Sequence, residues 1–80
     1  LVVAFANDAH SIGAAGKAVD MGIVKATLVG DRKQIQQVCS QENIDINQFE
    51  IVHEADEMAA ARKAVALINE GKGDMLMKGL

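Results

Sequence analysis

The hydrophobic residues of this chain gather in four short runs, and in the longer stretches between them apolar residues recur every three or four positions. These mainly apolar runs lie at residues 1–6, 26–29, 49–52 and 74–78. The first is apolar throughout, which is typical of a strand that is covered on both faces. Each interval is long enough for a helix that crosses over to the next parallel strand. The pattern therefore predicts alternating strands and helices.

Three helices are expected between these strands, because each interval has a recognisable start and stop. Asp8 or Ser11 is expected to cap the first helix, and Gly22 is expected to end it. Asp31 precedes the second helix and forms, with Gln34 three positions later, an Asp version of the capping box. In a capping box each of the two side chains binds the backbone N–H of the other residue.

The third helix is expected to begin after Asp56 and to stop at Gly71, and residues 44–48 are expected to form a polar linker. Helical periodicity predicts which apolar side chains face the sheet. In chain order these are Ile12, Ala15 and Val19, then Ile35, Val38 and Cys39, then Met58, Ala61, Val65 and Ile68. Gly13 and Gly16 lack the spacing of a phosphate-binding loop, and we expect them to allow close packing of the first helix on the sheet.

The predicted fold class is α/β, with a partial doubly wound parallel sheet of four strands and three helices. By analogy with other doubly wound sheets, we expect the spatial order 3-2-1-4. The chain begins within a strand, and its last strand ends at Lys78-Gly79, where a helix should follow. We therefore expect residues 1–80 to be the N-terminal part of the first α/β domain of a larger enzyme, with the remainder absent. Met75, Leu76 or Met77 should then be exposed.

Composition excludes several classes of partner. The chain has two Phe, no Tyr and no Trp, so it lacks the stacking platforms that bind single-stranded nucleic acid. Its net charge is −3 and no basic cluster is longer than the two residues of Arg32-Lys33, which disfavours nucleic acid and anionic membranes as partners. No apolar run approaches the ~20 residues of a membrane span. The single cysteine, Cys39, predicts a reducing, cytoplasmic location and a core role rather than a nucleophile.

Candidate chemistry lies in the loops that follow the strands, because parallel strands present their carboxyl ends at one edge of the sheet. His10 and His53 both lie there, but neither has a second ligand at helical spacing, so a polar contact or a cap is expected rather than a metal site. Lys78 would place an ammonium group at this edge, and Gly79 would let the backbone approach a ligand. A solvated lysine followed by a turn glycine is the alternative that spacing leaves open.

The chain resembles the start of the phosphate acetyl/butyryl transferase family. The matching residues occur in family order across nearly all of the chain: Ala6-Asn-Asp-Ala-His10, Ile12, Ala14, Ala18, Gly22-Ile23, Leu28-Val-Gly-Asp31, Ile35, Ile51-Val52 and Asp74-Met-Leu-Met-Lys-Gly79. The Leu-Met-Lys-Gly ending is more similar to the butyryl branch, because the acetyl branch usually has Ser before this glycine.

The resemblance implies a reaction in which acyl-CoA and inorganic phosphate give acyl phosphate and CoA, without a metal or bound cofactor. It also implies two α/β domains with the site in the cleft between them, and a homodimer. Lys78, Gly79, Asp8 and His10 are the substrate-binding residues that this part of the family would contribute. The catalytic residues are unknown, and the eighty residues alone are expected to be inactive.

The residues also bear on two other classes of protein. A non-catalytic α/β module that binds a small ligand or regulates a partner stays open as the alternative function. A receiver domain is disfavoured, because the third strand is followed by His53-Glu54 where that class needs a phosphoaccepting Asp.

Overall fold

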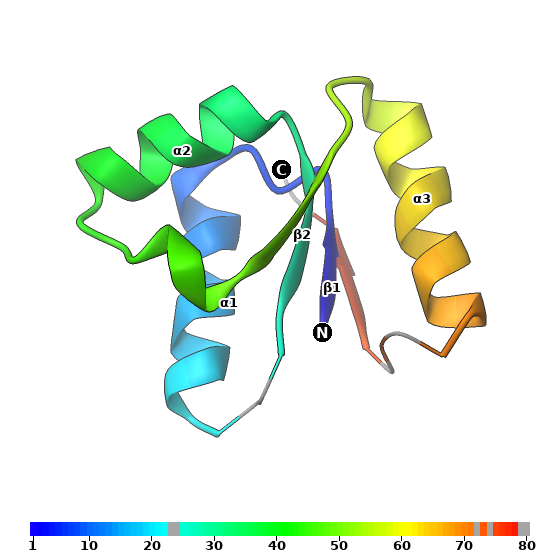
Figure 1. Ribbon diagram of the computed structural model, residues 1–80, viewed down its shortest axis with the longest axis horizontal. Coiled ribbons are helices and arrows are strands. Elements are labelled where there is room, and N and C mark those ends of the chain that lie inside the picture. The colour runs from blue at the N-terminus through cyan, green and yellow to red at the C-terminus, as the bar shows by residue number, and fades with distance from the viewer. Residues whose placement is uncertain (23–24, 72, 74, 79–80) are drawn as a thin grey trace.

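The structure is a computed structural model, and it describes residues 1–22, 25–71, 73 and 75–78. Strands and helices alternate along it as predicted (Figure 1). The strands are β1 (Val2–Ala4), β2 (Thr27–Gly30), β3 (Glu50–His53) and β4 (Leu76–Lys78). The helices are α1 (Ala9–Asp20), α2 (Arg32–Gln41) and α3 (Glu57–Asn69), with a short 3-10 helix, η1 (Ile46–Gln48), before β3. The linker expected at residues 44–48 is thus partly helical, because Asp45 caps η1 by accepting from the Asn47 amide.

The four strands form one parallel sheet in the order β3-β2-β1-β4, which confirms the predicted order. The helices α1 and α2 cover one face of this sheet and α3 covers the other (Figure 1). Strand β1 is therefore an inner strand, with β2 on one side and β4 on the other. Residue 74 of the predicted fourth strand lies outside the described residues, as does Gly79.

Alternate residues of the inner strands fill two separate cores. Val3 and Leu28 point toward α1 and α2, where they pack with buried residues of those helices: Ile12, Ala15, Ile35 and Cys39. The neighbouring strand residues point the other way and pack against α3, a cluster made of Val2, Ala4, Val29, Ala60 and Ala64. The prediction for Cys39 as a small core residue is confirmed, since its side chain is 2% exposed.

The predicted inward face of α3 is wrong in part. Met58 and Val65 are exposed, at 69% and 46%, and the buried residues are Ala60 and Ala64. Two alanines four positions apart lie on one side of a helix and let it approach the sheet closely, so the longer side chains are turned to solvent. Ile68 of the predicted face is half-buried against this core.

The glycines of α1 do not have the packing role that was expected of them. A Cβ atom at Gly13 would meet nothing within 4 Å, and one at Gly16 would lie 3.8 Å from Gln48 and 3.9 Å from Phe49, an ordinary contact. Neither position therefore requires glycine for close approach to the sheet. Gly22 and Gly71, by contrast, have φ of 103° and 77°, which confirms them as the helix stops.

The strand β4 is covered less than the other strands. Met75 and Leu76 are 56% and 51% exposed, as predicted, while Met77 is half-buried against the α1 side of the sheet. None of the helices in the described ranges is long and apolar enough to cross a membrane.

Candidate active site at the carboxyl ends of the strands

The sheet has a switch point between β1 and β4. The chain leaves β1 through α1 on one face, and it enters β4 from α3 on the opposite face. In open α/β sheets, ligands bind beyond the carboxyl ends of the strands where the winding direction changes in this way. Lys78 is the last residue of β4, is exposed, and pairs in register with Ala4 at the end of β1. The predicted site lysine thus lies at the switch point.

The loop after β1 turns sharply before α1 begins. Phe5 has a φ of 54°, a left-handed conformation that is unusual for a bulky residue. The Asn7 amide then donates to the Phe5 carbonyl at 3.0 Å, and Asp8 caps α1 by accepting from the Ser11 amide at 2.8 Å and the Ser11 hydroxyl at 2.9 Å. Of the two caps that the sequence allowed, Asp8 is the one used. His10 lies exposed in the first turn.

The start of α2 is held by residues from three strand ends. The Asp31 carboxylate accepts from the Lys33 amide at 2.9 Å and the Gln34 amide at 3.3 Å. The Asp31 amide donates to Asn7 Oδ1 at 2.8 Å, so the reciprocal bond of the predicted capping box comes from Asn7 and not from Gln34. That part of the prediction was wrong, because a side chain 24 positions away occupies the place of the local one.

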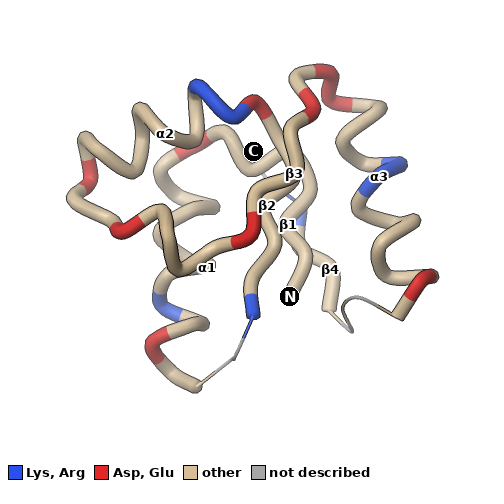
Figure 2. The backbone as a smooth tube through the Cα atoms, viewed as in Figure 1, with Lys and Arg blue, Asp and Glu red and all other residues tan. Residues whose placement is uncertain are grey.

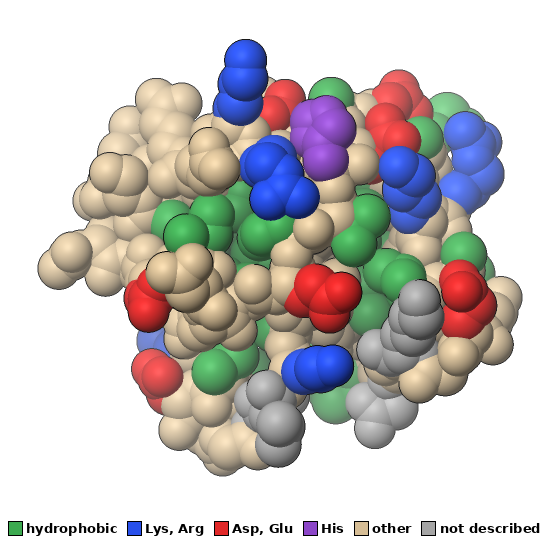
Figure 3. Space-filling model, viewed as in Figure 1, with side chains coloured by type: hydrophobic (Ala, Val, Ile, Leu, Met, Phe, Trp, Pro, Cys, Tyr) green, Lys and Arg blue, Asp and Glu red, His purple; other side chains and the backbone are tan. Residues whose placement is uncertain are grey.

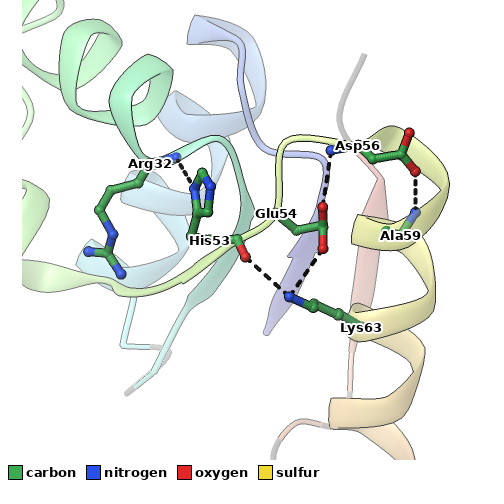
Figure 4. Close-up of polar contacts among 6 residues, drawn as sticks. All are labelled: Arg32, His53, Glu54, Asp56, Ala59 and Lys63. Atoms are coloured by element: carbon green, nitrogen blue, oxygen red, sulfur yellow. Dashed lines mark hydrogen bonds and ion pairs between the residues drawn. The ribbon is translucent and has the colours of Figure 1, made fainter.

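His53, at the end of β3, also contacts the first residue of α2 (Figure 4). Its Nδ1 atom accepts from the Arg32 amide at 3.1 Å, which confirms the expectation that this histidine makes a capping contact. His53 is the last residue of β3, and β2 lies between β3 and β1. His53 therefore lies beside the loop after β2 and not at the switch point between β1 and β4. Acidic and basic segments lie side by side where α2 begins (Figure 2).

An ion pair ties the end of β3 to α3 beside His53. Lys63 Nζ lies 3.1 Å from Glu54 Oε1 and donates to the His53 carbonyl at 3.3 Å (Figure 4). The Lys63 hydrogen bond, with a further one from the Asp56 amide, holds the pKa of Glu54 below its ordinary value. Asp56 in turn caps α3 through the Ala59 amide at 2.9 Å, as predicted. These groups are structural partners of one another.

Two other groups are unsuited to chemistry at this edge. Burial raises the pKa of the Cys39 thiol, and the negative charge of Asp45 raises it further, so the thiolate nucleophile is disfavoured. Within the described part of the chain, no three His, Cys, Asp or Glu side chains are grouped so that they could hold a metal ion.

Two hollows differ in their position relative to the sheet. A cavity of about 440 Å³ lies at the amino ends of β2 and β3 beside the end of α3, and is lined by Lys25, Thr27, Glu50, Leu67 and Gly71 (Figure 3). A smaller one of about 270 Å³ lies along α1 and is lined by Ala9, His10, Gly13, Ala14 and Lys17. The Ala9–His10 end of the second hollow follows the carboxyl end of β1, where parallel sheets place their chemistry, whereas Lys17 lies two turns farther along α1.

Three residues of this region were missed by the sequence reasoning. Lys17 shares the α1 hollow with His10, and the spacing of seven positions, two helical turns, was a usable signal. Asn7, in the loop after β1, lies against Gly30 at the end of β2, and nothing local in the sequence indicates that contact. The fold and this edge define an open, doubly wound parallel α/β protein with its candidate site between β1 and β4.

Comparisons with known proteins narrow that class. The family described as "Phosphate acetyl/butaryl transferase" matches residues 1–79. The chain is 44% identical over 80 residues to a phosphate butyryltransferase of Clostridium acetobutylicum, covering 100% of this chain and 27% of that protein. It is 42% identical over 78 residues to a phosphate acetyltransferase of Rhizobium meliloti, covering 98% of this chain and 25% of that protein. A phosphate butyryltransferase of Clostridium beijerinckii is 39% identical over 80 residues, with 100% and 26% covered.

The chain belongs to the phosphate acetyl/butyryl transferase family, as the resemblance implied. It spans about a quarter of the length of these relatives. Its identity to the butyryl and acetyl enzymes is nearly equal, at 44% and 42%, so overall similarity does not distinguish the two acyl groups.

Proposed function

We propose that the full-length protein transfers an acyl group between CoA and inorganic phosphate, a freely reversible reaction. The observation that carries this proposal is the family match over residues 1–79. In the forward direction a phosphate oxygen attacks the thioester carbonyl carbon, a C–O bond forms, and the C–S bond breaks. The CoA thiolate leaves and takes up a proton, while the acyl phosphate is released. CoA is a substrate, and the proposal includes no bound cofactor or metal.

The described residues support this chemistry at the switch point. A dianionic phosphate and the phosphates of CoA need cationic groups and N–H donors close to the reacting thioester. Lys78 supplies an exposed ammonium group at the end of β4, and His10 is exposed in the first turn of α1. We assign Lys78 to phosphate or to the CoA phosphates, and we assign the same ligand to the Gly79 amide on the family match alone.

Asp8 has a different part in this proposal. Its carboxylate already accepts bonds from the amide and hydroxyl of Ser11. A carboxylate repels phosphate, so Asp8 serves the substrate by ordering the first turn of α1, which carries His10. The phosphate-gripping and catalytic groups of the family are assigned to the part of the protein beyond these residues.

Finer features of the proposal rest on the resemblance. We propose a preference for butyryl over acetyl groups, which is based only on Met77, Lys78 and Gly79. A homodimer, a cytoplasmic location, and a first α/β domain that continues beyond these residues are predictions of the same kind. An apolar pocket discriminates by about 10- to 200-fold per methylene, which sets the expected size of the acyl preference.

The test compares acetyl-, propionyl- and butyryl-CoA with the full-length protein at saturating phosphate, in the presence of a metal chelator, with CoA release as the readout. The highest kcat/KM is expected for butyryl-CoA. If acetyl-CoA gives the highest value, the branch assignment is wrong and the reaction class stands. If none of the three is a substrate, the enzyme proposal falls and the alternative of a non-catalytic ligand-binding or regulatory module takes its place. The names of the relatives favour the transferase.

A further inference from the structure

Asn7 joins two loops that the sequence keeps far apart. Its Oδ1 atom accepts from the Asp31 amide at 2.8 Å, across 24 positions of the chain. The side chain is half-buried, so this bond is partly shielded from water. The bond connects the loop after β1, which leads to His10, with the turn that begins α2.

Gly30 makes room for this contact. A Cβ atom at Gly30 would overlap Asn7 Oδ1 and would lie 3.1 Å from the Ala6 nitrogen. Gly30 does not have a positive φ, so its backbone conformation is open to other residues. The requirement for glycine here comes from space, and the space is taken by the Asn7 amide group.

The other bonds of the β1–α1 loop do not have the same effect. Asp8 binds Ser11 within its own helix, so its cap does not fix α1 relative to the neighbouring turn. The Ala6 amide donates to the Val29 carbonyl at 3.0 Å and continues the pairing of β1 with β2, before the chain turns toward α1. Asn7 acts after that turn, immediately before the helix cap.

We infer that Asn7 is a positioning residue for the proposed acyl transfer: by binding the Asp31 amide against Gly30, it sets the first turn of α1 relative to Lys78 at the switch point. This inference rests on the proposed function. Lys78 is fixed through the pairing of β4 with β1, whereas His10 is carried by α1. The distance between the two groups therefore depends on where the loop between β1 and α1 is held.

The experiment compares Asn7→Ala, Asn7→Asp and Asp45→Ala in the full-length protein. Asn7→Ala removes the acceptor, and Asn7→Asp keeps an oxygen at the same branch point. Asp45→Ala is the matched control, because it removes a bond of the same kind, to the Asn47 amide at 3.0 Å, from the loop before β3. The readouts are kcat and KM for acyl-CoA and phosphate, the melting temperature, and hydrogen exchange at the Asp31, Ser11 and Ile12 amides.

Asn7→Ala is expected to lower kcat/KM by on the order of 10- to 100-fold, since small displacements of positioned groups cost this much. Asn7→Asp should recover most of the loss, and Asp45→Ala should leave kcat/KM unchanged at a similar melting temperature. Exchange at Ser11 and Ile12 should become faster in Asn7→Ala alone. Equal kcat/KM in Asn7→Ala and wild type, with only a lower melting temperature, overturns the inference.

The experiment distinguishes failure of the proposed function from failure of this inference about Asn7. If the wild-type protein transfers no acyl group, the proposed function falls and hydrogen exchange decides the placement role of Asn7. Faster exchange at Asp31, Ser11 and Ile12 in Asn7→Ala, absent from Asp45→Ala, then supports the placement of α1 by Asn7. Exchange that is unchanged at Ser11 and Ile12 overturns it.

Discussion

The first turns of α1 and α2 leave the same edge of the sheet from adjacent strands, but they are held in different ways. The start of α2 is bound from both sides, by Asn7 from the loop after β1 and by His53 from β3. The start of α1 is capped by Asp8, which immediately precedes the helix and binds Ser11 in its first turn. On the β2 side, Asn7 connects this loop to the Asp31 amide. Its other side adjoins the switch point, where Lys78 ends β4.

This difference indicates which of the two helix starts is the weaker candidate for binding a ligand. The Arg32, Lys33 and Gln34 amides at the start of α2 all donate to acceptors of the protein itself, so little remains there for a substrate to bind. The loop after β2 is held on both sides and in turn holds Asn7 of the loop after β1, which is the kind of support that positioned groups in a site need. The following variants of the full-length protein test this comparison.

The largest effect is expected at the open side. Lys78→Ala should raise KM for phosphate or CoA by about 10- to 150-fold, which corresponds to about 1.5–3 kcal/mol for a bond to a charged group. Lys78 is exposed, so the free energy of unfolding should change by less than about 0.5 kcal/mol. Lys25→Ala, an exposed lysine before the amino end of β2, is the matched control for steady-state kinetics. Unchanged kinetics with a lower melting temperature would make Lys78 a structural residue.

The next effect concerns the contact between the two loops. Gly30→Ala should lower the free energy of unfolding by about 1–3 kcal/mol, because the added methyl group forces Asn7 out of its place. Gly13→Ala is the control, because its methyl group meets nothing and should raise stability by about 0.5–1 kcal/mol through helix propensity. Denaturant midpoints measure both. Equal shifts of the two variants would contradict the steric argument.

A smaller effect distinguishes the two helix caps. Removing a cap side chain costs about 0.5–2 kcal/mol. Asp8→Ala should lie near the top of this range, because it also leaves the buried Ser11 hydroxyl without this acceptor. Asp31→Ala should lie near the bottom, because His53 and Asn7 still hold the start of α2. Urea unfolding of both variants checks the order, and the reverse order would mean that α2 is not held redundantly.

The smallest effect is the pH dependence of the pair beside His53. The pKa of Glu54 is lowered by Lys63 in the folded protein, so the pair stabilises above the ordinary glutamate pKa of 4.5. That contribution is lost as the pH falls through the folded value. Glu54→Gln should therefore flatten the acid limb of the stability profile slightly, and added salt should reduce the difference from wild type. An identical acid limb in the variant would mean that the pair adds nothing measurable.

Features with a local cause could be predicted from the sequence. The caps Asp8, Asp31 and Asp56 bind amides two or three positions away, so the residue types alone indicate them. The strands and their parallel order follow from apolar runs separated by helix-length intervals. The family resemblance and the position of Lys78 at a strand end also came from the sequence.

Features that depend on packing between distant segments could not be predicted. The inward face of α3 was misplaced because Met58 and Val65 are more hydrophobic than Ala60 and Ala64, although close packing on the sheet selects the smaller pair. The bond between Asn7 and Asp31 was missed because Gln34 forms a plausible local motif with the same amide. Such a competition between a near and a far partner is decided by the tertiary fold.

The pairing of β1 with β4 has a consequence for the order of folding. Val2 pairs with Thr27 of β2 and with Leu76 of β4. The separation along the chain between Val2 and Leu76 is about three times that between Val2 and Thr27. Closing the longer loop costs about 1 kcal/mol more in chain entropy, so β4 should join after β1 and β2 have paired. In pulse-labelling exchange, the Val2 amide, bonded to Met75, should gain protection later than the Thr27 amide, bonded to Leu1. Simultaneous protection would contradict this order. If the order holds, the strand pairing that brings Lys78 beside Ala4 is among the last parts of this sheet to form.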